Sequence, residues 1–246
     1  MTAPVFVVED VTAGDGGRYV LDGPEGRHAV SVKRLRAGEA VVLTDGAGRW
    51  ADCVVLGTEG KDRLVVKMDS CAEEPAESPR ITVVQALPKG DRGELAVETM
   101  TETGVDAVVP WTAARCITQW KGDRGLKALA KWRATAREAG KQSRRIRFPE
   151  VADAASTKQV AALLADADFA AVLHEEGSEP LATAELPADG HIVLVVGPEG
   201  GVSPDELAAF AQAGAKPYRL GSTVLRTSTA GTAATALLLG RTGRWS

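Results

Sequence analysis

The sequence HIVLVVGPEGG, residues 191–201, joins an apolar run at 191–196 directly to a glycine-rich turn. An uninterrupted apolar run predicts a parallel strand that is buried on both faces. A helix is predicted directly after the turn, because Ser203 is a favourable N-cap, Pro204 takes the first helical position and Glu206 completes a capping box. A buried strand that opens through glycines into a helix is typical of an α/β sheet, whose ligands bind at the carboxyl ends of the strands.

Alternating apolar and amphipathic segments surround this sequence. The predicted strands are 81–86, 107–110, 169–173 and 191–196, and the predicted helices are 93–103, 125–142, 157–165, 204–213 and 229–239. This alternation predicts a mostly parallel sheet flanked by helices.

The first seventy residues have a different pattern. Short β-rich runs at 5–8, 40–44, 51–56 and 64–68 are separated by glycine and aspartate turns, which predicts a small β-barrel. Residues 71–79 contain two prolines and no apolar periodicity, as in a linker. We therefore expect a β-barrel domain at 1–72, a linker at 73–80 and an α/β domain at 81–246.

The composition argues against a disulfide-bonded, metal-binding or membrane protein. The three cysteines, Cys53, Cys71 and Cys116, are odd in number and widely spaced, and the three histidines are equally dispersed. No apolar run approaches the length of a membrane span, and the first eight residues lack the basic lead of a signal peptide. We therefore expect a cytoplasmic protein with reduced thiols and no metal.

The charged residues are unevenly distributed along the chain. The net charge is −4, yet residues 115–147 hold eleven basic and two acidic residues, which gives a local charge of +9. A solvated helix face normally mixes both signs. The local excess therefore favours a surface that binds a polyanion such as RNA.

The glycine turn at 197–201 does not by itself identify a ligand. It lacks the dinucleotide pattern G-x-G-x-x-G and no Lys-Ser or Lys-Thr follows it, which argues against a nicotinamide-dependent oxidoreductase and a P-loop enzyme. A second segment, YRLGSTVLRTSTAGTAA at 218–234, adds a strand, a glycine-containing loop and a helix of small residues. The pair G-P-E-G-G and L-G-x-x-x-L-R-T-x-T-A is similar to the SPOUT methyltransferases, specifically to those that methylate N3 of a uridine in 16S ribosomal RNA.

Further stretches agree with this resemblance, which spans nearly the whole chain. PKGDR at 88–92, TETGV at 101–105, KWR at 131–133 and QSRR at 142–145 resemble the family's methyltransferase domain, and HAVSVKRLR at 28–36 resembles the segment that marks its PUA-like barrel. The resemblance implies a C-terminal α/β domain threaded through a trefoil knot, with an N-terminal PUA-like β-barrel. It also implies S-adenosylmethionine as cofactor, a homodimer, and ribosomal RNA or the small ribosomal subunit as partner.

The resemblance assigns site residues to three loops and to the basic segments. The cofactor residues would be Leu173, His174, Gly197, Pro198, Glu199, Gly200, Gly201, Leu220, Gly221, Val224, Leu225 and Arg226. The RNA-binding residues would be Arg34, Arg36, Gln142, Arg144, Arg145 and Arg147. For Gln142 and Arg145 helix capping or surface solvation is the alternative, and for Arg34 and Arg36 a charge that protects a strand edge.

Arg226 is the candidate catalytic residue, because a guanidinium group suits the uracil oxygens on which negative charge develops when N3 loses its proton. A salt bridge that braces the loop is the alternative. Glu199 could accept a proton, but an acidic residue beside a glycine turn more often bonds a backbone amide.

One departure from the family concerns the helix that follows the third loop, where family members usually carry Glu at the position of Ser228. Ser228 leaves a non-catalytic role open, and a second enzymatic function also stays open. The chain could methylate the ribose 2′-oxygen of RNA, since that branch shares the fold, or it could be a non-catalytic RNA-binding protein of ribosome assembly.

Overall fold

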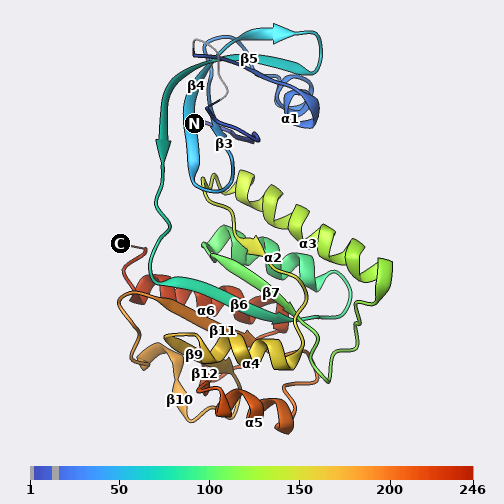
Figure 1. The fold of residues 1–246 in the computed structure, drawn as a ribbon, viewed down its shortest axis with the longest axis vertical. Helices are drawn as coiled ribbons and strands as arrows, with labels where there is room; N and C mark the ends of the chain where they lie inside the picture. The colour runs from blue at the N-terminus through green and yellow to red at the C-terminus, as the bar shows by residue number, and fades with distance from the viewer. Residues whose placement is uncertain (1–2, 13–16, 246) are drawn as a thin grey trace. The chain divides into compact units, whose positions relative to one another are not determined.

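The computed structural model describes residues 3–12 and 17–245 of the chain. Residues 1–2, which begin the N-terminal segment considered above, lie outside the described residues, as do 13–16 and 246 of the two expected domains. The described chain divides into two compact units (Figure 1). The first unit combines residues up to 76 with residues 140–148, and the second combines residues 77–139 with residues from 149 onward.

A five-stranded sheet forms the centre of the first unit. Its strands are in the order β1-β3-β4-β5-β2, with β1 parallel to β3 and the other pairs antiparallel. The elements are β1 (Val5–Val7), β2 (Arg18–Leu21), α1 (Gly23–Arg27), a π-helix (His28–Val32), β3 (Ala40–Thr44), β4 (Arg49–Glu59) and β5 (Arg63–Glu73).

The long β4–β5 hairpin curls this sheet around its own core. Two register shifts interrupt the pairing, between Asp52 and Cys53 and between Val55 and Gly57, and such bulges increase the local twist. The apolar face encloses Phe6, Leu43, Val55 and Leu64, each at most 1% exposed. The predicted β-rich N-terminal part is confirmed as a curled, mainly antiparallel sheet.

The second unit contains a seven-stranded sheet in which every recorded pairing is parallel. The strand order is β10-β12-β9-β11-β6-β7-β8. The strands are β6 (Arg80–Ala86), β7 (Ala107–Trp111), β8 (Glu150–Val151), β9 (Phe169–Leu173), β10 (Glu179–Pro180), β11 (His191–Val196) and β12 (Lys216–Arg219). The helices are α2 (Arg92–Thr103), α3 (Gly122–Gln142), α4 (Thr157–Ala165), a 3-10 turn (Leu181–Thr183), α5 (Pro204–Gln212) and α6 (Thr227–Arg241).

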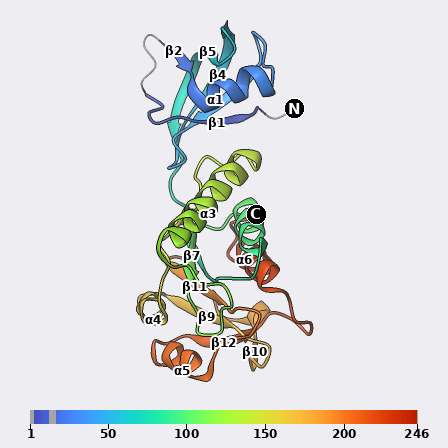
Figure 2. The ribbon, with the colours of Figure 1, turned by 90° about the vertical axis from the view of Figure 1, so that its right-hand side faces the viewer.

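Helices cover both faces of this parallel sheet. α2 and α6 pack together on one face, and α4 and α5 pack together on the other (Figure 2). The run predicted at 191–196 is the central strand β11, whose residues Ile192 to Leu194 are fully buried. The predicted α/β architecture is therefore confirmed. No helix in the described ranges combines the length and apolarity needed to cross a bilayer.

Residues 140–148, which we call the return segment, belong to the first unit although they continue from α3. The ammonium group of Lys141 pairs with the Glu25 carboxylate at 2.8 Å, and both side chains are buried, 5% and 13% exposed. The Thr44 hydroxyl donates to the carbonyl oxygen of Ile146 at 2.8 Å. Side-chain and backbone contacts thus hold the return segment against the sheet of the first unit.

Candidate active site

Three adjacent parallel strands end at the same level of the second unit. Leu173 of β9 is the Cα partner of both Val196 of β11 and Tyr218 of β12. The backbone N–H of His174 donates to the carbonyl oxygen of Tyr218 at 3.0 Å, which ties the first loop, residues 173–175, to the neighbouring strand. The three segments expected to bind the cofactor therefore begin side by side at one edge of the sheet.

The second loop is the glycine turn at residues 197–201, and groups from distant parts of the chain anchor its start. The Thr227 hydroxyl donates to the carbonyl oxygen of Gly197 at 2.9 Å. The Glu199 carboxylate accepts a hydrogen bond from the backbone N–H of Lys89 at 3.1 Å. Glu199 therefore binds a backbone amide of the loop that follows β6.

The glycines of this loop are required by close contacts and by backbone conformation. The Arg115 guanidinium donates to the carbonyl oxygen of Gly200 at 3.0 Å. A Cβ atom at Gly200 would lie 3.2 Å from the Cβ of Arg115, and Gly201 has a φ of +73°. A larger residue at either position would strain the turn, because L-residues rarely adopt positive φ and the space at Gly200 is filled.

Helix α5 begins at the end of this loop with the predicted capping box. The Ser203 hydroxyl accepts from the Glu206 N–H, and the Glu206 carboxylate accepts from the Ser203 N–H. The same carboxylate accepts from the Ala114 N–H at 2.7 Å and from the Thr157 hydroxyl at 3.2 Å. Burial raises the pKa of Glu206, but these hydrogen bonds outweigh burial and leave the pKa below its ordinary value.

The third loop, residues 220–226, presents backbone and apolar side chains to solvent. Val224 is 75% exposed and Leu225 38% exposed. Within the described residues, the backbone amides of Gly221, Val224 and Leu225 donate no hydrogen bond. The loop therefore offers free main-chain donors beside an apolar surface.

Arg226 ends this loop and is the N-cap of α6. Its carbonyl oxygen accepts from the N–H groups of Thr229 and Ala230. Its exposed guanidinium group makes no ion pair or side-chain hydrogen bond with any part of the chain that the structure describes. The backbone of Arg226 is therefore fixed, while its cationic group is available to a ligand.

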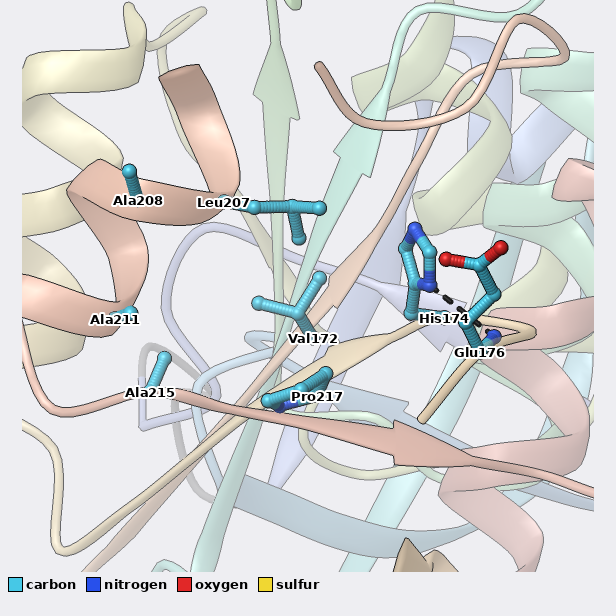
Figure 3. Close-up of a pocket in the computed structure, with 8 residues that line it drawn as sticks. All are labelled: Val172, His174, Glu176, Leu207, Ala208, Ala211, Ala215 and Pro217. Carbon is cyan, nitrogen blue, oxygen red and sulfur yellow. Dashed lines mark hydrogen bonds between the residues drawn. The ribbon is translucent and has the colours of Figure 1, made fainter. Parts of the chain in front are cut away.

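His174 belongs to the first loop and also lines a pocket of about 380 Å³ on the α5 side of the sheet. Figure 3 shows this pocket, with His174 and Glu176 close together and the Nδ1 atom of His174 accepting from the Glu176 N–H at 3.2 Å. The other lining residues are small or apolar: Val172, Leu207, Ala208, Ala211, Ala215 and Pro217.

Ser228 lies in the first turn of α6. This helix begins at Thr227, two residues before the predicted start at 229. Its side chain is buried, and its hydroxyl oxygen accepts from the Arg92 guanidinium at 3.4 Å. The position at which the family usually carries Glu is therefore a buried contact between α6 and α2.

The residues expected to bind RNA all belong to the first unit, but they differ in what their side chains contact. Arg34, Arg36, Gln142 and Arg144 are exposed. Arg145 donates to the Arg147 carbonyl oxygen at 2.8 Å, and Arg147 donates to the Glu74 carbonyl oxygen at 2.7 Å. The first four side chains are thus open to solvent, and the last two brace the return segment.

Part of the basic excess is neutralised inside the second unit. Lys131 pairs with Glu94 at 2.9 Å, and Arg133 pairs with Asp153 at 2.9 Å. Lys121, Arg124 and Lys127 remain exposed on and before α3. In the described ranges no group of three or more His, Cys, Asp or Glu side chains is arranged to hold a metal ion.

Four residues that hold the loops were not among the expected site residues. Gln85, Lys89, Arg115 and Thr227 contact the glycine loop or its anchors, directly or through one hydrogen bond. They come from β6, from the loops after β6 and β7, and from the start of α6. No motif spacing could have grouped them, because the parallel sheet brings their segments together.

Comparison with known proteins identifies a family for both parts of the chain. Residues 76–239 match the family described as RNA methyltransferase domain, and residues 21–69 match the RNA methyltransferase PUA domain. A protein of Mycobacterium bovis named ribosomal RNA small subunit methyltransferase E is 47% identical, over all of this chain and 94% of that protein. The Bacillus subtilis protein of the same name is 30% identical, over 86% of each chain.

The crystal structure of ribosomal RNA small subunit methyltransferase E of Neisseria gonorrhoeae, bound to S-adenosyl methionine, has a TM-score of 0.83. It is 28% identical in sequence, and the match covers 98% of both chains. The resemblance inferred from the paired glycine motifs is therefore confirmed over the whole chain. The protein belongs to the RNA methyltransferase family whose members include the ribosomal RNA small subunit methyltransferases E.

Proposed function

We propose that this chain transfers a methyl group from S-adenosylmethionine to N3 of a uridine in the 16S ribosomal RNA of the small subunit. The observation that carries the proposal is the convergence of three loops at the ends of β9, β11 and β12, in a chain of this RNA methyltransferase family. The carboxyl edge of a parallel sheet is where such domains bind their ligands.

The three loops offer main-chain donors and apolar surface that suit S-adenosylmethionine. The unpaired amides of Gly221, Val224 and Leu225 suit the acceptor nitrogens of an adenine ring, and the exposed Val224 and Leu225 side chains suit its faces. Leu173, His174, Leu220 and residues 197–201 complete the proposed cofactor site. When bound, the sulfonium group supplies the methyl group.

The chain must deal with the N3 proton of uridine, because neutral N3 is a poor nucleophile. We assign Arg226 to stabilise negative charge on the uracil oxygens, since its guanidinium has no protein partner in the described residues and its backbone is fixed as a helix cap. Glu199 is a weaker candidate for the proton acceptor, because its carboxylate already binds the Lys89 amide.

The first unit supplies the RNA-binding surface in this proposal. Residues 1–72 would form the PUA-like domain and 81–246 the methyltransferase domain, whose return segment, 140–148, belongs to the first unit. Arg34, Arg36, Gln142 and Arg144 are exposed and could contact phosphate directly. Arg145 and Arg147 would act mainly by holding the return segment.

We further propose a cytoplasmic homodimer whose methyltransferase domain is threaded through a trefoil knot. Besides the two aliphatic side chains assigned to the cofactor site, three described aliphatic side chains of the second unit are exposed: Leu95, Ile117 and Leu126. Burial of these side chains against a second copy would remove apolar surface from water. Sedimentation of the purified chain as a monomer would contradict the dimer.

The decisive experiment is nucleoside analysis of small-subunit RNA. A strain that lacks this chain should lose one 3-methyluridine from 16S ribosomal RNA, and the wild-type gene should restore it. A matched strain expressing the Arg226→Ala variant should restore little of it. Unchanged 3-methyluridine with loss of a 2′-O-methyl nucleoside would favour ribose methylation, and no change in any methylated nucleoside would favour a non-catalytic assembly role.

A further inference from the structure

A buried chain of hydrogen bonds connects the sheet to the glycine loop. The side-chain nitrogen of Gln85, on β6, donates to the Thr227 hydroxyl at 3.0 Å, and that hydroxyl donates to the Gly197 carbonyl at 2.9 Å. Gln85 is fully buried, and Thr227 is 7% exposed. Bulk solvent has little access to Gln85 and Thr227, so their hydrogen bonds lie in a low-dielectric interior.

The direction of these bonds follows from the groups themselves. The Gly197 carbonyl can only accept, so the single hydroxyl proton of Thr227 points to it. Thr227 must then accept from Gln85, whose second side-chain N–H donates to the Ala86 carbonyl at 3.1 Å. Both N–H groups of the Gln85 amide therefore have acceptors, which determines how the amide is oriented.

This arrangement has a cost for the fold. The side-chain oxygen of Gln85 is buried and has no hydrogen-bond partner among the described residues. A buried acceptor without a partner destabilises the folded state, because it has lost its hydrogen bonds with water. An apolar side chain of similar length at this position of β6 would avoid that cost but would lose the hydrogen bonds to Thr227 and to the Ala86 carbonyl. The distinctive contribution of the glutamine is therefore its contact with Thr227.

These hydrogen bonds, which we call the Gln85–Thr227 relay, join two of the loops proposed to bind the cofactor. Gly197 begins the second loop, and the next residue, Pro198, has no N–H with which to fix the turn. Thr227 follows Arg226, the last residue of the third loop. One hydroxyl therefore fixes the beginning of the second loop relative to the end of the third, and Gln85 fixes that hydroxyl.

We propose that Gln85 and Thr227 are positioning residues that hold the two loops in the geometry that binds the methyl donor. This inference rests on the proposed function, because it assumes that the two loops bind S-adenosylmethionine. Neither residue contacts the cofactor in this proposal. They act through the Gly197 carbonyl and through the backbone at Arg226.

The test measures the affinity for S-adenosylmethionine by calorimetry and the thermal midpoint of unfolding in the same preparations. Thr227→Val keeps the shape of the side chain and removes the hydroxyl, and it should weaken binding about tenfold. Thr227→Ser keeps the hydroxyl and should bind like the wild type. Gln85→Met should weaken binding several-fold, while its thermal midpoint should change little because removal of the unpartnered oxygen offsets the loss of two hydrogen bonds.

Thr232→Val is the matched control. It removes another threonine hydroxyl of α6, whose hydrogen-bond partner is Thr99 of α2 at 2.7 Å rather than a residue of either loop. Its affinity for S-adenosylmethionine should equal that of the wild type.

Two kinds of failure can be distinguished. Wild-type protein that binds no S-adenosylmethionine would refute the proposed function and, with it, this inference. Normal wild-type binding, with unchanged affinity in Thr227→Val and Gln85→Met, would refute the inference alone. Equal losses in Thr227→Ser and Thr227→Val, or losses that follow the thermal midpoints across all variants, would assign the relay to the fold and also refute it.

Discussion

Replacing Arg144 with glycine should make this protein more stable, although the substitution removes an arginine proposed to bind RNA. Arg144 follows the C-terminus of α3 and has a φ of +61°. The N–H of Arg144 donates to the Lys141 carbonyl at 3.2 Å, and the N–H of Arg145 donates to the Gly140 carbonyl at 2.9 Å. These two bonds form a Schellman motif, in which glycine is the preferred residue at the left-handed position.

The magnitude follows from the conformation of this one residue. A side chain with a Cβ atom in the left-handed region costs roughly 1–2 kcal/mol. Glycine removes this strain but adds freedom to the unfolded chain, which offsets about 0.5–1 kcal/mol. The net gain is about 0.5–1 kcal/mol, which raises the thermal midpoint of a chain of 246 residues by roughly 1–4 °C.

Differential scanning calorimetry of Arg144→Gly and Arg144→Ala measures this gain. Alanine removes the same exposed guanidinium but keeps the Cβ atom, so it should not raise the midpoint. Binding of a small-subunit RNA fragment should weaken in both variants, with a shallower dependence on salt because one phosphate contact is lost. Equal midpoints for glycine and alanine would refute the strain argument, and unchanged RNA affinity would refute the proposed contact.

The other predictions concern the ion pair between Lys141 of the return segment and Glu25, the half-buried His191, and the thiols. Lys141→Met should destabilise the protein by about 3–5 kcal/mol in urea unfolding, because the Glu25 carboxylate stays buried and loses this cation, and adding Glu25→Leu should recover most of the loss. A double variant as unstable as the single one would contradict this reasoning. Burial and the nearby Arg80 lower the pKa of His191 below 6.5, so the unfolded state binds more protons. The stability from neutral His191 is therefore complete above pH 6.5 and is lost as the pH falls through the folded pKa. In His191→Gln the thermal midpoint should depend less on pH across that range. In native protein a thiol reagent should modify Cys71 alone, since Cys53 and Cys116 are buried; rapid labelling of more than one thiol per chain would contradict the structure.

Much of the α/β unit could be predicted, because its signals are local. The helix at 157–165 and the strands at 169–173 and 191–196 have the predicted bounds. Capping boxes at Ser156 and Ser203 and long apolar runs are visible in a few consecutive residues. The order of the strands in the sheet is not local, and pattern alone did not predict it.

The segment between residues 18 and 32 was not predicted. It forms β2, α1 and a π-helix, yet residues 23–27 include two glycines and a proline, which disfavour helix on propensity. The strands β8 and β10 have two residues each and exist only through pairing with β7 and β12. Tertiary contacts decide such elements, so a sequence pattern of ordinary length contains no sign of them.

The candidate site was only partly visible in the sequence. The glycine loops could be assigned through their resemblance to a family, but Gln85, Lys89 and Arg115 could not, because each meets its loop partner more than eighty residues away. The charge of residues 115–147 was also ambiguous. The sequence does not reveal that Arg147 donates to a carbonyl oxygen while Arg144 is exposed.

The return segment changes how this protein could be divided into fragments. A cut at the linker before β6 would sever only one of three covalent connections, since the chain also crosses between the units near residues 139 and 149. A fragment beginning at residue 77 would keep Ile146 and Phe148 but lose the sheet against which they lie. Neither unit is therefore a contiguous piece of the gene. Recombination that exchanges one unit between relatives would need three breakpoints, one at the linker and one on each side of residues 140–148, or would have to carry both units together.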